Sequence, residues 1–375
     1  MNVGILIRGV YPQNTGGQEL HGNELIKHFL EERGKIYLIS NTFIPKIIAK
    51  NKNFHFYRTP IPNIPKFKFI LKILLNFLTL ILIHKKNKLN VIHGHGTLAE
   101  GLSTIFFSNI FKIKSVITVH GGGVYSFGKR FPRIVSYILK NANQIIVTND
   151  FLKKQVSEFI VSDKNVHIIP NSVLIDRFKP LNKIKILESN FPNLKNKFIL
   201  LTVARLEKIK NIEFLIELVK SLEKSIPNMK LLIIGKGNLK KYLEKKVQKL
   251  GISSKIHFLG EINHIELPIY YNIADVFILL SRMEGQGLAI LEAMACGCMV
   301  IASKIGGIKN SIENGLNGFL VNFENRREIE KLIKKIQQNQ VNINEIKKNA
   351  RNKILDNFNW DKNFSKILAV YKKST

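Results

Sequence analysis

Apolar and polar positions alternate along the chain in two kinds of run. Short runs rich in Ile, Val, Leu and Phe are followed by longer stretches in which apolar residues recur at helical spacing. This alternation is typical of strand–helix–strand units, which build parallel β-sheets with helices on their faces. The pattern therefore predicts an α/β fold.

The predicted strands form two series. In the first series we expect strands near residues 3–8, 36–40, 90–93, 115–119, 144–148 and 166–169. In the second we expect them near residues 198–203, 230–234, 255–259, 275–279, 299–302 and 318–321. Between the series, Pro180 and Pro192 frame a polar, lysine-containing stretch, as in a linker. We therefore predict one domain over residues 1–180 and a second over residues 181–357, which a length of 375 residues accommodates.

One segment of the first series departs from this alternation. Residues 66–88 read KFKFILKILLNFLTLILIHKKNK, with an apolar run too short to span about 30 Å of hydrocarbon as a helix. On a helix, four polar side chains would form one stripe beside a wide apolar face: Lys68, Lys72, Asn76 and Thr79. We predict peripheral contact with an anionic membrane through Lys66 to Lys88. The alternative is an amphipathic helix that covers the sheet.

The chain is strongly basic, with 58 Lys and Arg against 27 Asp and Glu and a formal net charge of +31. The excess is concentrated in the first series, where Glu100 is the single acid between Glu32 and Asp150. A membrane surface, a nucleic acid or a lysine-rich codon bias would each explain it. No nucleic-acid recognition motif is visible among the basic residues, so we expect no nucleic-acid partner.

The two cysteines predict neither a disulfide nor a structural metal. Cys296 and Cys298 have a C-G-C spacing that matches neither a zinc knuckle nor a C-x-x-C redox pair. Residues 1–10 run directly into an apolar, strand-like segment without the basic start and cleavage site of a signal peptide. We expect a cytoplasmic protein, peripheral on the inner face of the cell membrane.

The strongest chemical signal lies in residues 281–297, which read SRMEGQGLAILEAMACG. Gly285 and Gly287 permit a tight loop after a predicted strand, and the residues that follow are strong helix formers. A helix starting near Gly287 would present free amides and its positive dipole end at the carboxyl edge of the sheet, where a pyrophosphate is stabilised without a metal. Glu284 and Glu292 bracket this helix start and can accept hydrogen bonds from sugar and ribose hydroxyls.

This segment resembles the E-x7-E donor motif of the family 4 retaining glycosyltransferases, which have the GT-B fold. Residues 204–211, ARLEKIKN, are similar to the family's stretch after the first strand of the second domain, where an arginine and a lysine clasp the donor diphosphate. Other similar stretches are spread over most of the chain: residues 16–17, 118–121, 169–171, 234–237, 258–260, 267–275 and 306–318.

The resemblance implies an architecture. It is that of two Rossmann-like domains whose parallel sheets face across a crevice, with acceptor binding in the first domain and donor binding in the second. Residues 358–375 are similar to the family's C-terminal helix, which crosses back to pack on the first domain.

The resemblance also implies roles for named residues. Arg205 and Lys210 would stabilise the negative charge that develops on the departing diphosphate. His120 would line the reaction centre beside the transferred sugar; the alternative is a structural loop histidine. The implied catalytic residues are His120, Arg205, Lys210 and Glu284. The implied donor-binding residues are Gly16, Gly17, Arg205, Lys210, Gly235, Gly237, Glu284, Gly285, Gln286, Gly287, Leu288 and Glu292.

Two weaker signals lie in the first series. Gly16 and Gly17 precede an amphipathic helix and allow either close approach to a ligand or a plain tight turn. His93 and His95 stand two apart after a predicted strand; without an evident third metal ligand, we assign them to the crevice wall.

The implied reaction is transfer of a hexose or N-acetylhexosamine from a nucleotide sugar, with UDP favoured, and retention of anomeric configuration. The acceptor that fits the basic first domain is a saccharide or a lipid-linked saccharide of a bacterial envelope. No D-x-D metal motif occurs, so we expect neither metal nor cofactor. Gln286, Ala289 and Ser172 depart from the family pattern, which leaves the sugar undetermined. The alternatives are a GT-B nucleotide-sugar epimerase and, less favoured, a nucleic-acid-binding protein.

Overall fold

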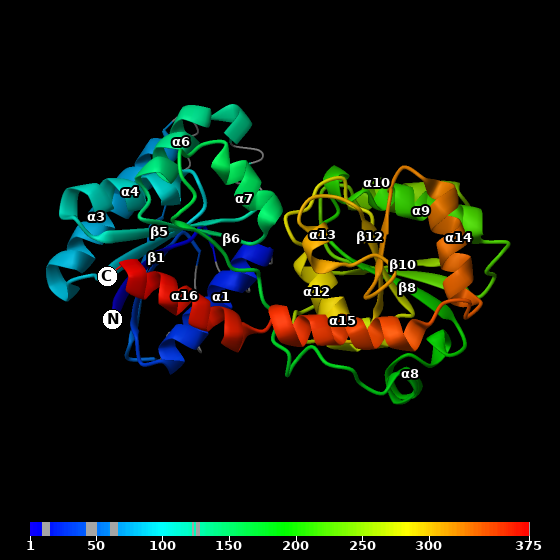
Figure 1. Cartoon of the computed structure of the whole chain (residues 1–375). Coiled ribbons are helices and arrows are strands. Elements are labelled where there is room, and N and C mark those ends of the chain that lie inside the picture. Colours follow the sequence, from blue (N-terminus) through cyan, green and yellow to red (C-terminus); the bar gives the residue numbers. More distant parts are fainter. Residues whose placement is uncertain (10–15, 43–50, 61–66, 122–123, 125–127, 375) are drawn as a thin grey trace. The chain divides into compact units, whose positions relative to one another are not determined.

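The structure, a computed structural model, describes residues 1–9, 16–42, 51–60, 67–121, 124 and 128–374. The chain forms two compact units (Figure 1). The first comprises Met1–Asn171 and Asp361–Thr375, and the second comprises Ser172–Trp360. No helix within these described ranges is both long and apolar enough to cross a membrane.

The first unit is built on a seven-stranded parallel sheet with the order β3-β2-β1-β4-β5-β6-β7. The strands are β1 (Asn2–Leu6), β2 (Lys35–Ser40), β3 (Phe54–Arg58), β4 (Val91–His95), β5 (Lys114–Val119), β6 (Gln144–Val147) and β7 (Val166–Ile168). The helices are α1 (Gly17–Glu31), α3 (Lys68–Asn87), α4 (Ala99–Phe111), α6 (Pro132–Asn141), α7 (Asp150–Ser157) and α16 (Trp360–Ser374).

The second unit is built on a six-stranded parallel sheet with the order β10-β9-β8-β11-β12-β13. The strands are β8 (Phe198–Val203), β9 (Met229–Ile234), β10 (Ile256–Gly260), β11 (Val276–Leu279), β12 (Met299–Ser303) and β13 (Phe319–Val321). The helices are α8 (Lys183–Asn190), α9 (Ile212–Leu222), α10 (Lys240–Lys249), α11 (Leu267–Ile273), α12 (Leu288–Ala295), α13 (Ile308–Ser311), α14 (Arg326–Gln337) and α15 (Ile343–Asn357), with two 3-10 turns, η1 (Pro192–Leu194) and η2 (Lys208–Lys210).

Both faces of the second sheet are covered by helices. Along β8, Ile199 and Leu201 pack in a core shared with α11, α12 and α15, whereas Leu200 packs in a core shared with α9, α10 and α14. Successive side chains of a strand point to opposite faces, so a strand buried on both sides reads as one continuous apolar run. This explains why the sequence predicts these strands well.

Every strand expected from the sequence is present, and one more, β3, is present that the sequence analysis did not predict. It is an edge strand paired only with β2 in this sheet, in register from Ile36 with Phe54 to Ser40 with Arg58. Its sequence, FHFYR, is short and mixes aromatic with polar residues. A strand that buries little of its surface lacks the long apolar run from which a strand is predicted.

The units divide at Asn171 rather than near Pro180, because residues 172–180 pack with the second unit. The Val173 amide donates to the Phe358 carbonyl at 2.8 Å, and Phe178 is buried in the core around α12. At the other end, α16 packs in the first unit, as the fold class requires. Its Tyr371 is fully buried, and the Tyr371 hydroxyl lies 2.6 Å from His93 Nδ1 of β4.

Candidate functional site

The second sheet has a switch point between β8 and β11. These strands are neighbours in the sheet but far apart in sequence, because the chain runs outward from β8 to β10 and then returns to β11. Ligands of such sheets bind where the strand order reverses, beyond the carboxyl ends of the strands. The two loops that leave this point are residues 204–211 and 280–287, which carry half of the donor residues expected from sequence.

The first loop is fixed by the loop after β9. The Ala204 amide donates to the Ile234 carbonyl at 3.0 Å, and the Leu206 amide donates to the Lys236 carbonyl at 2.9 Å. Gly235 has φ +139°, and a Cβ there would lie 1.9 Å from the Ala204 carbonyl oxygen. A Cβ on Gly237 would lie 2.3 Å from the Leu206 carbonyl oxygen. Both glycines therefore permit close backbone packing that holds the Arg205 loop.

The structure brings Lys210 and Glu284 together. The Arg282 amide donates to the Ile209 carbonyl at 2.8 Å, which joins the two loops at the switch point. Beside this bond, Lys210 Nζ donates to Glu284 Oε2, and each side chain is 15% exposed. An ammonium carries three N–H groups and a carboxylate four lone-pair sites, so this contact leaves both groups able to bind a ligand.

Arg205 lies on the same loop as Lys210 and is exposed. Its Nη1 donates to Glu207 Oε1 at 2.8 Å, but the Arg205 side chain is 63% exposed. An exposed pair of this kind contributes little stability. The guanidinium is therefore available to an anionic ligand.

A buried amide adjoins Lys210. Asn211 adopts φ +56° and caps α9, and its side chain is 6% exposed. Among the described residues, Asn211 Nδ2 has no hydrogen-bond partner. A buried donor that the protein leaves unpaired is costly, which favours a ligand oxygen at this position.

The helix expected after the glycine loop begins where the sequence places it. Leu288 is the first residue of α12, and Gly287 caps it with φ +77°, a conformation that favours glycine. Gly285 and Gln286 precede the cap, and the Gln286 side chain is buried. The first amides of α12 therefore face the end of the loop that carries Glu284.

Glu292 lies on the second turn of α12 and is buried. Its Oε1 is 2.6 Å from His264 Nε2, and its Oε2 accepts a hydrogen bond from the Tyr271 hydroxyl at 2.8 Å. Burial and the Glu292 carboxylate raise the pKa of Tyr271 well above its ordinary value. Sequence reasoning did not find these two partners. Tyr271 lies in a stretch similar to the family, but no spacing rule links it or His264 to α12.

The first sheet also has a switch point, between β1 and β4, and four histidines gather near it: His21, His93, His95 and His120. His95 ends β4 and His120 follows β5, and their Nδ1 and Nε2 atoms lie 3.1 Å apart. His95 also packs on His93, with ring centroids 4.2 Å apart. His93 Nε2 lies 2.6 Å from Thr118 Oγ1. His120 is therefore held by neighbours rather than placed on a free loop.

Burial keeps these imidazoles neutral. Desolvation lowers the pKa of His21 to about 4 and that of His93 to about 3. Burial and neighbouring histidines lower the pKa of His95 and of His120 well below the ordinary value. Neutral imidazoles can exchange hydrogen bonds with hydroxyls but do not attract phosphate as cations. No group of three or more metal-binding side chains occurs among the residues that the structure describes.

The glycines expected near this cluster begin α1. Gly16 caps the helix and Gly17 is its first residue. A Cβ on Gly16 would lie 2.3 Å from Glu19 Oε2. Gln18 Nε2 donates to the His95 carbonyl at 3.2 Å, which holds the start of α1 beside β4. His21 lies one turn after Gly17 on α1, and the sequence analysis did not select it as a site residue. Its position in the first turns of the helix that follows β1 could have indicated it.

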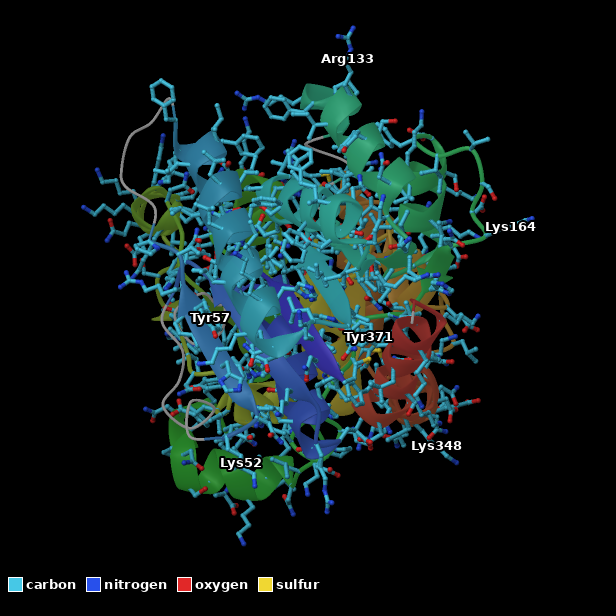
Figure 2. The ribbon with its side chains drawn as sticks, turned by 90° about the vertical axis from the view of Figure 1, so that its left-hand side faces the viewer. Lys52, Tyr57, Arg133, Lys164, Lys348 and Tyr371 are labelled. Atoms are coloured by element: carbon cyan, nitrogen blue, oxygen red, sulfur yellow. The ribbon has the colours of Figure 1, made fainter. Side chains whose placement is uncertain are left out.

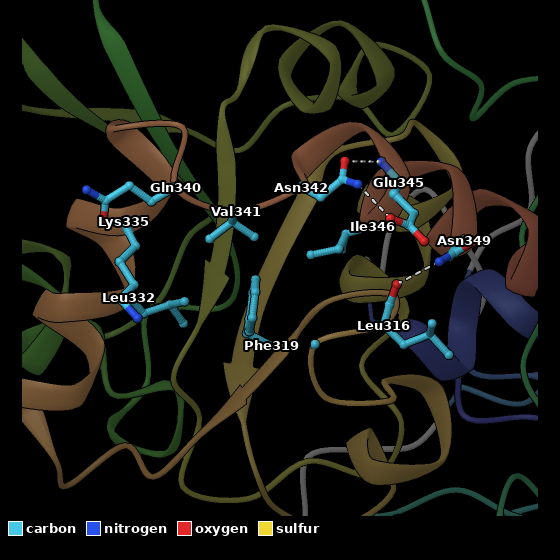
Figure 3. A pocket seen from close by; sticks show the side chains of 11 residues that line it. Leu316, Phe319, Leu332, Lys335, Gln340, Val341, Asn342, Glu345, Ile346 and Asn349 are labelled. Carbon is cyan, nitrogen blue, oxygen red and sulfur yellow. Dashed lines mark hydrogen bonds between the residues drawn. The ribbon is translucent and has the colours of Figure 1, made fainter.

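A separate pocket of about 370 Å³ lies at the start of β13, between α14 and α15 (Figure 3). Its walls include Leu316, Phe319 and Leu332, and on one side Asn342 donates a hydrogen bond to Glu345. Phe319 is the first residue of β13, so this pocket lies at the amino edge of the sheet. It contains none of the site residues expected from sequence.

Comparison with known proteins identifies the family. The model of glycosyl transferases group 1 matches residues 185–353, and that of glycosyltransferase family 4 matches residues 15–177. An uncharacterized glycosyltransferase of Methanocaldococcus jannaschii is 30% identical, covering 76% of this chain and 76% of its own. This chain belongs to glycosyltransferase family 4. The family resemblance expected from the sequence is therefore confirmed.

Two further relatives of this family 4 glycosyltransferase carry informative names. The UDP-Gal:alpha-D-GlcNAc-diphosphoundecaprenol alpha-1,3-galactosyltransferase of Escherichia coli is 28% identical and covers 80% of each chain. The alpha-monoglucosyldiacylglycerol synthase of Acholeplasma laidlawii is 28% identical and covers 71% of each chain.

Solved structures share the fold of this glycosyltransferase. Sucrose-phosphate synthase from Thermosynechococcus elongatus has a TM-score of 0.87 at 21% identity, covering 99% of this chain and 98% of the other. HepE of Anabaena, in complex with UDP-glucose, has a TM-score of 0.84 at 18% identity, covering 100% of both chains. With the two parallel sheets, this likeness confirms the GT-B class. The crevice between the two units stays a prediction.

Proposed function

We propose that this glycosyltransferase moves a hexose or N-acetylhexosamine from a UDP-sugar to a saccharide or lipid-linked acceptor, with retention of configuration, in bacterial envelope polysaccharide or lipopolysaccharide synthesis. The observation that carries the proposal is the contact of Lys210 with Glu284 at the switch point of the second sheet. This contact puts a cation beside a carboxylate, and we propose that the cation binds the diphosphate of the donor and the carboxylate binds a hydroxyl of its sugar.

The donor proposal is supported by the relatives. The name of the Escherichia coli relative gives UDP-Gal as its donor, and the Anabaena structure holds UDP-glucose. We propose the same nucleotide for this chain. The sugar itself depends on contacts around Gln286 and Ala289, where the sequence departs from the family pattern.

The proposed chemistry assigns a task to each side chain. The acceptor oxygen attacks the anomeric carbon while the bond from that carbon to the diphosphate oxygen breaks, and this leaving oxygen takes the acceptor's proton. Arg205 and Lys210 stabilise the charge that develops on the diphosphate, and an interaction that strengthens in the transition state accelerates the reaction. Glu284 orients Lys210 and accepts from a sugar hydroxyl. His120, neutral and held by His95, contacts the transferred sugar.

We propose that no divalent metal takes part in this reaction, because Arg205, Lys210 and the first amides of α12 supply positive charge for the diphosphate. The test is the rate of UDP release in the presence of EDTA. We expect the native rate to be unchanged. A loss of activity in EDTA that Mg²⁺ or Mn²⁺ restores would overturn this part of the proposal.

The decisive experiment for function uses a panel of UDP-, GDP- and ADP-sugars. We expect one UDP-sugar to raise the midpoint temperature of thermal unfolding of the full chain, because it binds the folded state. Products are then analysed with and without lipid-linked and free saccharide acceptors. An α-linked product that forms only with acceptor supports transfer. Conversion of the donor to its epimer without acceptor would identify an epimerase instead.

The acceptor proposal is supported by two relatives whose names contain a membrane lipid, diphosphoundecaprenol in one and diacylglycerol in the other. A lipid-linked acceptor lies in a bilayer, so an enzyme that uses it benefits from working at the membrane surface. We therefore propose that this glycosyltransferase acts peripherally on the inner face of the cell membrane.

A further inference from the structure

Two side chains of the polar stripe of α3, Lys72 and Asn76, face the protein rather than the outside. Lys72 Nζ donates to Glu100 Oε1 of α4, and these side chains are 13% and 10% exposed. Asn76 is fully buried, and its Oδ1 accepts from Thr59 Oγ1 at 3.3 Å. Lys66 lies outside the described residues. A helix lying in a membrane surface was expected to turn its lysines toward the headgroups, and for Lys72, which is paired with Glu100, that orientation is wrong.

The outward side of α3 is apolar instead. Ile70, Leu74, Leu78 and Leu82 recur at four-residue spacing and are between 51% and 67% exposed. With Phe67 before them and Phe106 and Ile110 on the adjoining α4, they form what we call the α3–α4 face. Figure 2 looks onto these two helices, which lie side by side in front of the sheet. A helix on the surface of a water-soluble protein ordinarily turns its polar residues outward, so this face indicates a partner.

The exposed apolar side chains form one continuous row along α3. From Ile70 to Leu82 it extends roughly 18 Å along α3, at about 1.5 Å per residue. A helix lying in the plane of the membrane buries one apolar side at the boundary of headgroups and acyl chains. The α3–α4 face has the same form.

The charges beside the face are of one sign. Lys85, Lys86 and Lys88 follow its apolar row and are exposed, and Lys112 is exposed at the end of α4. The one acid in this part of the sequence, Glu100, is bonded to Lys72. α3 is followed by β4 and α4 by β5, which are neighbouring parallel strands. The lysine-bearing ends of both helices therefore lie at the amino ends of these strands, at the same edge of the sheet. Anionic headgroups would neutralise these lysines, whereas a second copy of the chain would add further positive charge.

We propose that the α3–α4 face lies in the surface of an anionic membrane, with its apolar side chains below the headgroups and Lys85, Lys86, Lys88 and Lys112 against the phosphates. The inference deepens the proposed transfer to a lipid-linked acceptor, and its biological purpose rests on that function. Vesicle binding itself requires neither donor nor acceptor, so the two proposals fail separately.

The test is sedimentation of the full chain with vesicles of phosphatidylcholine and phosphatidylglycerol in equal parts. We expect the native protein to bind these vesicles. The affinity of the double variant Leu74→Ser/Leu82→Ser should be lower by a factor of roughly ten or more, because two apolar side chains no longer enter the bilayer. The variant Lys85→Gln/Lys86→Gln should bind anionic vesicles more weakly than the native chain. The matched control is Ile184→Ser/Leu316→Ser, which removes two exposed apolar side chains from the second unit and should bind like the native protein.

Several results would overturn the proposal. The first is that the native chain does not bind anionic vesicles, and the second is that it binds vesicles of pure phosphatidylcholine equally well. The third is that Leu74→Ser/Leu82→Ser, with an unchanged circular dichroism spectrum, binds anionic vesicles as tightly as the native chain. A dimer in sedimentation velocity that this variant alone dissociates would assign the face to a second copy of the chain. Stabilisation by UDP-sugars is measured in parallel without vesicles. A chain that binds vesicles but never transfers sugar would refute the proposed function and leave the membrane surface standing.

Discussion

Lys210 and Glu284 are 74 positions apart in the chain, and their contact depends on the order of the strands. Each follows a strand at the switch point, and one backbone bond, from the Arg282 amide to the Ile209 carbonyl, fixes the distance between the loops. Each member of the pair is 15% exposed, so a diphosphate could reach the ammonium without a large rearrangement. In the proposed mechanism, the pair is a preorganised cation for the donor.

Replacement of Lys210 by Ala should lower kcat/KM by about 10²- to 10³-fold, because a charge that stabilises the departing diphosphate is lost. The measurement is UDP release at several donor concentrations. Lys208→Ala is the matched control, since Lys208 lies on the same 3-10 turn η2 and is exposed. Native kcat/KM in Lys210→Ala would remove the lysine from the proposed mechanism.

Gly235 supports the site through its backbone conformation. Gly235→Ala should lower the free energy of unfolding by about 3 kcal/mol or more, because its Cβ would meet the Ala204 carbonyl at 1.9 Å. Gly251→Ala is the control: Gly251 also has positive φ, +67°, but a Cβ there meets nothing within 4 Å. For this control we expect a loss of only about 1 kcal/mol. Urea unfolding of the full chains measures both, and equal losses would contradict the steric argument.

At the scale of elements, the carboxyl ends of β4 and β5 and the start of α1 bring four histidines together. Each of these elements contributes one or two of them, and a parallel sheet places its carboxyl ends at one edge. Their neutral state has a consequence for stability. A group whose pKa is lowered by folding resists protonation, so protonation favours the unfolded chain.

The first unit should therefore lose stability as the pH falls below about 6.5, the ordinary histidine pKa, and continue to lose it towards the values of about 4 for His21 and about 3 for His93. Each of these groups contributes a slope of about 1.4 kcal/mol per pH unit within its window. Urea unfolding at several pH values measures the slope.

The variant His21→Gln separates this effect from general acid unfolding. It should reduce the slope by about 1.4 kcal/mol per pH unit between pH 6 and pH 5, because one titrating group is removed. His55→Gln, on the edge strand β3 and outside the cluster, is the matched histidine substitution for comparison. An unchanged slope in His21→Gln would show that His21 is not kept neutral by folding.

At the scale of the whole molecule, the last helix completes the unit that the first residues begin. Phe364 and Tyr371 of α16 pack against Phe29 of α1, with ring centroids 6.3 and 6.0 Å apart. The Tyr371 hydroxyl also bonds to His93 at the centre of the sheet. The first unit is therefore assembled from both ends of the chain, and the histidine cluster depends on the C-terminal helix.

Tyr371→Phe should lower the stability of the first unit by about 1–3 kcal/mol, because it leaves the buried His93 Nδ1 without its partner. Tyr137→Phe is the control, since Tyr137 is 39% exposed and its hydroxyl can bond to water. Hydrogen exchange of the β4 and β5 amides reports on this unit by itself. Equal protection in the two variants would contradict the role assigned to Tyr371.

Much of the fold follows from local pattern. The core strands are buried on both faces and read as continuous apolar runs, so they were predicted, whereas the edge strand β3 has no such run and was missed. The loop residues of the proposed donor site were predicted from glycines, charges and family resemblance. His264 and Tyr271, which bond to Glu292, were not assigned, because their contact arises only when α11 packs against α12.

The sequence by itself determined that the chain is α/β in two halves and that a helix starts after Gly287. Its resemblance to the family predicted donor roles for Arg205 and Lys210 in one stretch and for Glu284 and Glu292 in another. These features depend on spacing along the chain, which the sequence contains. Only the tertiary structure decided which sides of the elements meet. It paired Lys210 with Glu284, gathered the histidines, and turned Lys72 and Asn76 of α3 inward. An amphipathic pattern predicts that a helix has a polar and an apolar side. Which side is buried depends on what the helix packs against, here α4 with Glu100.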